Sequence, residues 1–122
     1  KIYKALKQNK VICFAADQVP QRGMGEYIKF FNRDSYSTTL VQSLALKTKS
    51  PLVFLYINSN KDNYLTITIE SINNDIYKDS KHSPIINNGI EKIINKRPID
   101  YSWEYKRFKK NKPGQQDPYS GI

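Results

Sequence analysis

Cysteine and long apolar runs are scarce in this sequence, and both shortages limit what the chain can be. Cys13 is the single cysteine among 122 residues, so no internal disulfide can form and a reducing compartment fits. It lies in an apolar run, where we expect a buried, inert thiol. The longest apolar stretches, Val11 to Ala16 and Leu52 to Ile57, are far shorter than the roughly 20 residues that cross a bilayer. Neither stretch can span a membrane.

The chain also lacks most of the residue patterns that complete an active site. Its single histidine, His82, lies in a polar loop and is followed at the fifth position by Asn87. A His-x4-acid pattern, in which a carboxylate orients the imidazole as a base, is therefore narrowly missed, and an exposed loop histidine is favoured. One histidine and one cysteine so far apart offer no metal-ligand spacing, and no glycine-rich phosphate loop is present. We expect no metal or other cofactor.

Positive charge is what the chain has in excess, and it is concentrated near the end. The formal net charge is +9, while 39% hydrophobic and 25% charged residues describe a globular protein. Between Lys92 and Lys112, eight basic residues stand against two acidic ones, which gives a net +6 of that total. Aromatic residues are interleaved with the basic ones from Tyr101 onward. Such a localised field suits an anionic partner.

Apolar periodicity predicts a single domain of the α/β class, with a mixed sheet flanked by helices. The predicted strands are a central strand covered on both faces at 11–16, an extended piece at 26–31, a second covered strand at 52–57, and a half-exposed antiparallel strand at 65–69 that follows a turn. The predicted helices are 2–6, about 40–45 after possible capping residues at 32–37, 86–97 before Pro98, and 101–109.

Polar residues follow the first predicted strand, where ligands bind in open α/β sheets. Asp17 can hold a hydroxyl or a guanidinium, Arg22 can pair with a phosphate, and Gly23 allows close backbone approach. A loop held by an Asp17 to Arg22 ion pair explains the same residues equally well. Thr38, with its neighbours Ser37 and Thr39, could donate to an anion at a helix start, although capping explains it equally well.

The order of short motifs along the chain resembles that of a known family. The motifs are Val11 to Gln18, Arg22-Gly23, Tyr27 to Phe31, Thr38-Thr39 and Thr48 to Phe54, followed by a closing run that contains Asn87, Ile90, Glu91, Ile94, Pro98, Tyr101, Trp103, Arg107, Phe108, Lys109 and Pro113-Gly114. In order and spacing they are similar to the second half of the bacterial lipid A biosynthesis acyltransferases, the late lauroyl and myristoyl transferases. The similarity extends over nearly all of the chain.

This resemblance implies a partial glycerophosphate-acyltransferase-like fold and transfer of a fatty acyl chain from acyl carrier protein to a phosphorylated lipid A precursor. In that family the base is the histidine of a His-x4-Asp or Glu motif, which would lie ahead of Lys1. We therefore expect the chain to require a missing amino-terminal half and to be inactive alone. Residues 1–112 would form the carboxyl-terminal part of the acyltransferase domain, and 113–122 a flexible tail. The expected location is the cytoplasmic face of the bacterial inner membrane.

The resemblance also implies which residues face the substrate. Asp17, Gln18 and Arg22 would line the site, whereas no catalytic residue is expected within the chain. Arg107 and Lys109 match the closing signature, and a basic face there would suit phosphorylated lipid, anionic headgroups of a membrane surface, or the acidic carrier protein. A structural role for Arg107, paired with an acid of the missing half, stays open.

Two alternative functions remain at this point. A small basic nucleic-acid-binding module would fit the charge and the aromatic content. However, two covered strands leave no exposed aromatic sheet face, and no helix-turn-helix or ribonucleoprotein-type signature is present, so no nucleic acid is expected as a partner. A glycerophospholipid acyltransferase of the same superfamily would differ only in the acceptor.

Overall fold

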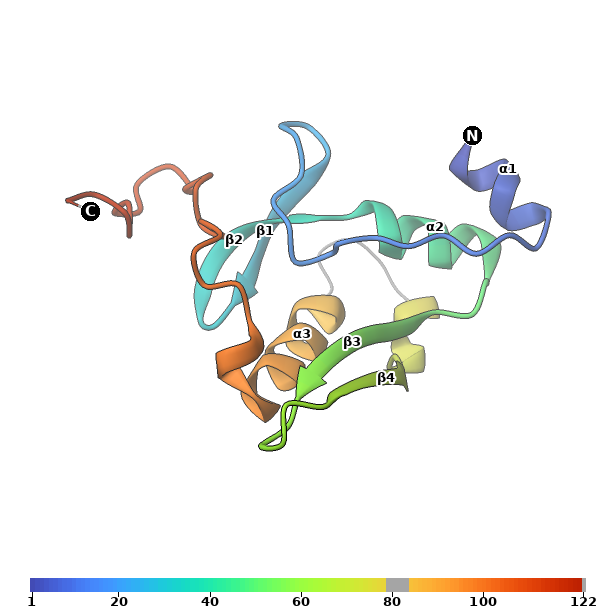
Figure 1. Ribbon diagram of the computed structural model, residues 1–122. Coiled ribbons are helices and arrows are strands. Elements are labelled where there is room, and N and C mark those ends of the chain that lie inside the picture. The colour runs from blue at the N-terminus through green and yellow to red at the C-terminus, as the bar shows by residue number, and fades with distance from the viewer. Residues whose placement is uncertain (79–83, 122) are drawn as a thin grey trace.

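The computed structural model describes residues 1–78 and 84–121, and within them the chain forms helices and two antiparallel strand pairs (Figure 1). The elements in chain order are α1 (Ile2–Lys7), β1 (Gly25–Phe30), β2 (Arg33–Thr38), α2 (Leu40–Thr48), β3 (Val53–Ser59), β4 (Leu65–Ser71), the 3-10 helix η1 (Asn74–Tyr77), α3 (Ile85–Lys96) and the 3-10 helix η2 (Pro98–Asp100). The predicted α/β class is confirmed. His82 lies outside the described residues.

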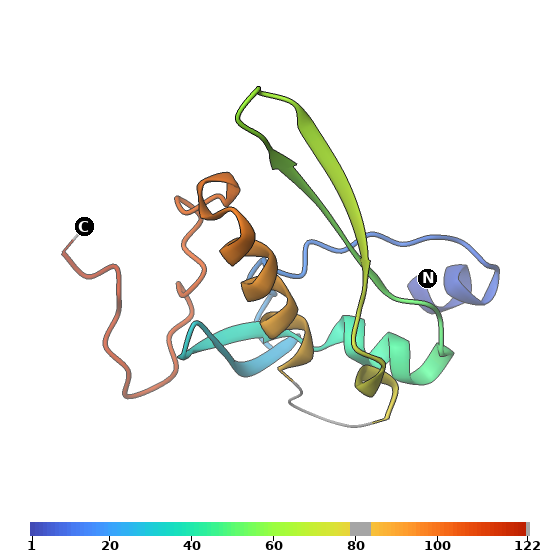
Figure 2. The ribbon, with the colours of Figure 1, turned by 90° about the horizontal axis from the view of Figure 1, so that it is seen from below.

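The strands form two hairpins, and α3 lies between them (Figures 1 and 2). In the first hairpin, β1 and β2 are joined by Phe31 and Asn32, which both have positive φ, as a tight two-residue turn requires. The backbone N–H of Phe31 donates to Glu91 Oε1 of α3 at 2.8 Å, which fixes this turn on the helix. The predicted extended piece at 26–31 is thus confirmed as β1 up to Phe30. The predicted helix caps at 32–37 are wrong, because Asn32 lies in the turn and the rest of this stretch belongs to β2.

A single mixed sheet was predicted, and this prediction is wrong for the part of the chain that the structure describes. The segment 11–16, expected as a covered central strand, is extended but pairs with no other strand. Val11 is 91% exposed and Cys13 is exposed too, so the prediction of a buried thiol is also wrong. Apolar composition favours an extended backbone, but a sheet requires a neighbouring strand on at least one side. The described residues supply none for this segment.

The second hairpin, β3 with β4, confirms the predicted strands and the turn between them. Its burial differs from the prediction, because the apolar face points to solvent. Each of its large apolar side chains on that face is more than half exposed: Val53, Leu55, Ile57, Leu65, Ile67 and Ile69. The opposite face packs on α3, where Phe54 lies against Gly89 so closely that a Cβ there would come within 2.3 Å of the ring.

Helices α2 and α3 confirm the predicted periodicity and build the core. The central buried cluster consists of Val41 of α2, Ile86 of α3, Ile76 of η1, and Ile72, which directly follows β4. Ile76 is fully buried. Helix α3 ends at Lys96, shortly before Pro98, as predicted.

The predicted helix at 101–109 is wrong, because this segment runs through irregular turns. Trp103 Nε1 donates to the carbonyl of Pro98 at 2.7 Å, and its ring packs edge-on against Tyr101. These local contacts, together with contacts to distant parts of the chain, override the helical spacing of the aromatic residues. Residues after 112 also touch the body: Tyr119 accepts a hydrogen bond from the Phe108 N–H at 3.0 Å. The predicted domain boundary at residue 112 stays a prediction.

A buried polar cluster joins β2, α3 and the carboxyl-terminal segment. Ser37 Oγ accepts hydrogen bonds from Asn87 Nδ2 at 3.0 Å and from Arg107 Nη2 at 2.8 Å, and it donates to the carbonyl of Ser35 at 3.0 Å. Arg107 Nη1 also donates to the carbonyl of Tyr36 at 2.9 Å. Ser37, Asn87 and Arg107 are each almost fully buried. Because buried polar groups need partners, this Ser37 cluster fixes where residues 101–110 can lie.

Replacing Arg107 with methionine tests the Ser37 cluster. Arg107→Met keeps much of the volume but removes both donors, leaving the Tyr36 carbonyl buried without a partner. We expect the free energy of unfolding in urea to fall by about 2 kcal/mol. The matched control is Lys106→Met, because Lys106 is the exposed neighbour and its replacement should change stability little. Equal, small effects of both substitutions would contradict a structural role for Arg107.

Candidate substrate-binding site

A polar loop, Asp17 to Gly23, follows the extended segment and is closed by a tyrosine of β2. Gly23 has φ +84°, a conformation that favours glycine. Its backbone N–H donates to Tyr36 Oη at 2.9 Å, and the N–H of Gly25 donates to the same oxygen at 3.2 Å. A Cβ on Gly25 would lie 2.4 Å from the carbonyl oxygen of Ser37. The loop therefore sits directly against β2.

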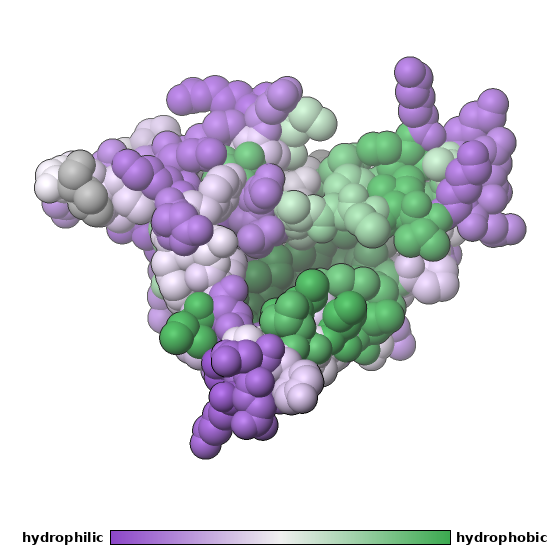
Figure 3. All heavy atoms as spheres, in the orientation of Figure 1, coloured by the Kyte–Doolittle hydropathy of each residue, from purple (hydrophilic) through white to green (hydrophobic). Residues whose placement is uncertain are grey.

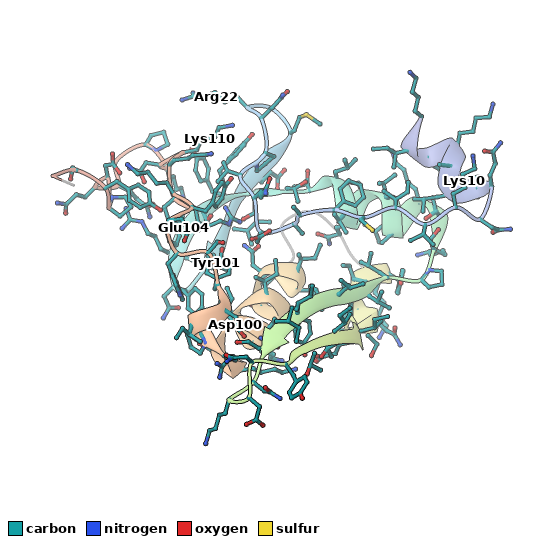
Figure 4. The ribbon with its side chains drawn as sticks, viewed as in Figure 1. Lys10, Arg22, Asp100, Tyr101, Glu104 and Lys110 are labelled. Atoms are coloured by element: carbon teal, nitrogen blue, oxygen red, sulfur yellow. The ribbon has the colours of Figure 1, made fainter. Side chains whose placement is uncertain are left out.

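The carboxyl-terminal segment lies on the other side of this loop. The N–H of Val19 donates to Tyr105 Oη at 2.8 Å, and Lys110 Nζ donates to the carbonyl of Pro20. The Lys110 ammonium also lies 5.3 Å from the centre of the Tyr36 ring. Figure 4 shows Arg22 and Lys110 at the same end of the molecule, with Lys10 far away at the other. Basic side chains from two distant parts of the sequence thus meet around one loop.

Three of the predicted site residues belong to the loop itself. Asp17 is half-buried, whereas Gln18 and Arg22 are exposed, with Arg22 near the loop tip (Figure 4). The backbone N–H of Gln18 donates to the carbonyl of Ala15 at 3.1 Å, which turns the chain after the extended segment. In this fully described loop, no ion pair joins Asp17 to Arg22, so the alternative of a loop held by that pair finds no support.

The other predicted residues flank the loop in different ways. Thr38 lies opposite Gly25 in the hairpin register, and its Oγ1 accepts from the N–H of Leu40, the first residue of α2, at 3.3 Å. Lys109 is exposed, with its ammonium 4.6 Å from the centre of the Tyr105 ring. Arg107, in contrast, is only 3% exposed and is held in the Ser37 cluster. Its guanidinium is bonded to β2 and thereby holds the backbone beside the loop.

Asp17, Tyr101 and Arg107 influence one another electrostatically. Burial raises the pKa of Tyr101 to about 12, and the negative charge of Asp17 adds to this effect. Burial lowers the pKa of Arg107, while Tyr101, Tyr105 and Asp17 oppose that change. The hydroxyl oxygen of Tyr101 is buried and has no hydrogen-bond partner in the part of the chain that the structure describes.

An apolar groove of about 480 Å³ begins beside Asp17 and Tyr101. It lies between the extended segment 11–16 and β3, and its floor consists of Val41, Ile72, Ile86, Ile90, Ile93 and Ile94. The space-filling view shows this hollow between two hydrophobic surfaces (Figure 3). The groove and the polar loop are therefore continuous.

Comparison with known proteins assigns this arrangement to a family. The model of the bacterial lipid A biosynthesis acyltransferases matches residues 1–110. The chain belongs to this acyltransferase family. No curated protein matches the chain. Among the described residues, the longest apolar helices are too short to cross a bilayer, and no three potential metal ligands lie together.

The candidate site contains residues that the sequence analysis did not single out: Tyr36, Tyr105 and Lys110. Tyr105 and Lys110 were assigned only to the predicted helix near 101–109, which does not form, and to the aromatic and basic excess of that region. Tyr36 stood in a stretch interpreted as helix caps. Each acts through a contact with a loop more than ten positions away, and no local pattern predicts such contacts.

Tyr101→Phe tests the electrostatic link within the candidate site. An unfolded tyrosine loses its proton near pH 10 and the folded Tyr101 near pH 12, so the raised pKa makes stability fall as pH rises between these values. We expect the free energy of unfolding of the phenylalanine variant to fall less steeply with rising pH in this range, because phenylalanine has no proton to release. Unfolding free energies of both proteins between pH 9 and about pH 12 measure the difference. Parallel curves would show that Tyr101 titrates normally.

Proposed function

We propose that this chain forms the acceptor-binding side of an enzyme that transfers a fatty acyl chain from acyl carrier protein to a lipid A precursor. The family assignment supports acyl transfer in lipid A biosynthesis. The observation that carries the finer proposal is that Lys109 and Lys110 are placed beside the loop that carries Arg22. Lys110 donates to the Pro20 carbonyl, and Lys109 lies over the ring of Tyr105, whose hydroxyl accepts from Val19. Exposed cations beside a polar loop suit a phosphorylated acceptor.

The proposed reaction is an acyl transfer that needs a base. The acceptor hydroxyl oxygen attacks the thioester carbonyl carbon, so that a C–O bond forms and the C–S bond breaks. The hydroxyl proton passes to the base and then to the departing thiolate. This sequence contains one histidine, His82, and its fifth following residue is Asn87. We therefore propose that a His-x4-acid motif outside residues 1–122 supplies the base and that the chain is inactive alone.

The residues of the site take distinct roles in this proposal. Arg22 and Lys109 bind phosphate oxygens of the acceptor, and Lys110 holds the loop through the Pro20 carbonyl. The Asp17 carboxylate accepts hydrogen bonds from sugar hydroxyls, and the Gln18 amide both accepts and donates them. Thr38 closes the far edge of the site beside Gly25. Arg107 is a positioning residue, because both of its terminal nitrogens are used within the protein.

The net charge of +9 is consistent with three proposed anionic partners. Acyl carrier protein is the acyl donor, the phosphorylated precursor is the acceptor, and anionic headgroups hold the protein at the cytoplasmic face of the bacterial inner membrane. The family assignment favours this hypothesis over a nucleic-acid-binding module.

Binding of a bisphosphorylated, tetraacylated glucosamine disaccharide tests the acceptor site. We expect Arg22→Ala and Lys109→Ala each to weaken binding to vesicles that contain this lipid by about tenfold, which is the value of one charge-assisted hydrogen bond. The matched control is Lys10→Ala, because Lys10 is an exposed cation far from the loop. Vesicles that contain the dephosphorylated lipid should bind all variants equally weakly.

Two results would contradict this function. One is equal weakening by all three substitutions, which would indicate attraction by net charge alone. The other is tight, salt-dependent binding of RNA or DNA without affinity for the lipid.

The requirement for an external base has a separate test. The isolated chain should transfer no acyl group from acyl carrier protein, whereas addition of an amino-terminal half that carries the His-x4-acid motif should restore transfer. Turnover by the chain alone that is lost in His82→Ala would place the base within this sequence.

A further inference from the structure

The apolar groove has two walls of extended backbone. One wall is the segment 11–16 and the other is β3, and the two run in broadly the same direction across the molecule (Figures 1 and 2). Side chains of α2 and α3 form the floor, including Val41, Ile90 and Ile94. A parallel sheet that is covered by helices and lacks its central strand would leave this arrangement: two parallel extended segments with a gap between them and helices on one face.

Both walls carry unpaired backbone groups. None of the backbone N–H groups of residues 11–16 donates a hydrogen bond within the described chain, and of their carbonyls only that of Ala15 accepts one, from Gln18. β3 pairs with β4 on one side only. Since successive amides of a strand point to opposite sides, half of the N–H and C=O groups of β3 face away from β4.

The free edge of β3 has a defined end. The N–H of Ser59 donates to Asp100 Oδ2 at 2.9 Å, and the hydroxyl of Ser59 donates to Oδ1 at 2.7 Å. These bonds lower the pKa of Asp100 to about 2. The carboxylate thus occupies the edge at Ser59, so the open part lies along residues 53–57.

We propose that this groove receives a parallel β-strand from the amino-terminal part of the acyltransferase domain, which pairs with β3 on one side and with residues 11–16 on the other. This inference rests on the proposed function, in which a separate part of the domain carries the base. In a parallel sheet the carboxyl ends of all strands meet at one edge. The residues that follow the inserted strand would therefore emerge beside Asp17, where a base must lie to reach an acceptor hydroxyl.

An acyl chain is the competing occupant of the groove. It would satisfy the apolar floor but leave the backbone donors and acceptors of both walls without partners in an apolar environment, which is costly. A strand satisfies the floor and both walls together. The proposed strand would also explain why residues 11–16 have the composition of a covered strand and yet pair with nothing in this chain.

The outer face of the second hairpin provides independent support. Leu55 lies opposite Ile69, and Ile57 lies opposite Ile67, in the β3–β4 register, and all four side chains are more than half exposed. Contiguous apolar faces of this kind mark sites that another element covers. A strand added in parallel requires a crossover connection, usually a helix, on a face of the sheet. The same incoming part of the domain can therefore supply both the strand and the cover.

Amide hydrogen exchange tests the inserted strand directly. The probe is the amino-terminal part of a lipid A biosynthesis acyltransferase, produced as a separate polypeptide that carries the His-x4-acid motif. We expect the amides of residues 11–16 and 53–57 that face the groove to exchange quickly in the free chain. On addition of the probe they should exchange at least about 100-fold more slowly, as paired strand amides do. In a parallel sample, laurate tests the acyl-chain alternative.

Two neighbouring residues within the extended part of the segment provide a matched control. Neither the N–H of Cys13 nor that of Phe14 donates a hydrogen bond within the described chain, so proline at either position removes no existing bond. In extended backbone the two amides point to opposite edges, and only one of them can face the groove. We therefore expect one of Cys13→Pro and Phe14→Pro to weaken binding of the probe at least tenfold and the other to change it little.

Three outcomes would overturn the inserted strand: no complex with the probe, a complex in which both walls still exchange quickly, or equal effects of the two proline substitutions. Protection of the groove by laurate but not by the probe would identify an acyl pocket instead. Failure of the proposed function is distinguishable. A protected groove without acyl transfer would refute the function alone, whereas binding of the phosphorylated lipid without protection would refute the strand alone.

Discussion

The hydroxyl of Ser37 is where β2, α3 and the carboxyl-terminal segment meet. It accepts from Asn87 and Arg107 and donates to the Ser35 carbonyl in a buried setting. An unpaired polar group there would be costly, so these side chains are constrained to one arrangement. Arg107 lies in the middle of the segment 101–110, and fixing it brings Tyr105 to Val19 and Lys110 to Pro20. The position of the basic site thus depends on a cluster that faces no substrate.

The exposed apolar surfaces of the chain and the proposed position of the catalytic base outside residues 1–122 have one explanation in this account. Three surfaces are unpaired or uncovered among the described residues: the segment 11–16, the free edge of β3 and the outer face of the second hairpin. The proposed acyl transfer requires a base, and the single histidine of this sequence, His82, is not part of a His-x4-acid motif. Both requirements are met if one additional part of the domain completes the sheet and carries the base.

Local patterns in the sequence were sufficient for α2, α3 and the second hairpin. The spacing of Ile86, Ile90 and Ile94 predicted α3, and the alternation of Leu65, Ile67 and Ile69 predicted β4. They failed where the outcome depends on distant partners. Residues 11–16 have the composition of a covered strand, but pairing depends on a neighbour that composition cannot reveal. Residues 101–109 have a helical spacing, yet contacts of Trp103 and Tyr105 decide their path.

The candidate site was predictable in its loop and not in its walls. Asp17, Gln18 and Arg22 follow an apolar run, so a polar loop at this place could be inferred from the sequence, whereas the sheet edge predicted beside it is not formed by the described residues. The resemblance to the family indicated Arg107 and Lys109, but it did not distinguish the buried guanidinium from the exposed ammonium. That distinction depends on Ser37 and Asn87, which lie 70 and 20 positions away from Arg107 in the sequence.

The most direct test of this account is lipid binding by Ser37→Ala, a variant that alters no exposed side chain. The remaining bonds of Asn87 to the Lys29 carbonyl and of Arg107 to the Tyr36 carbonyl should keep the chain folded, which circular dichroism can verify. We predict that its affinity for vesicles containing the bisphosphorylated lipid A precursor falls about tenfold, because the basic segment loses its anchor. Unchanged affinity in a folded but less stable variant would contradict the dependence of the site on the Ser37 cluster.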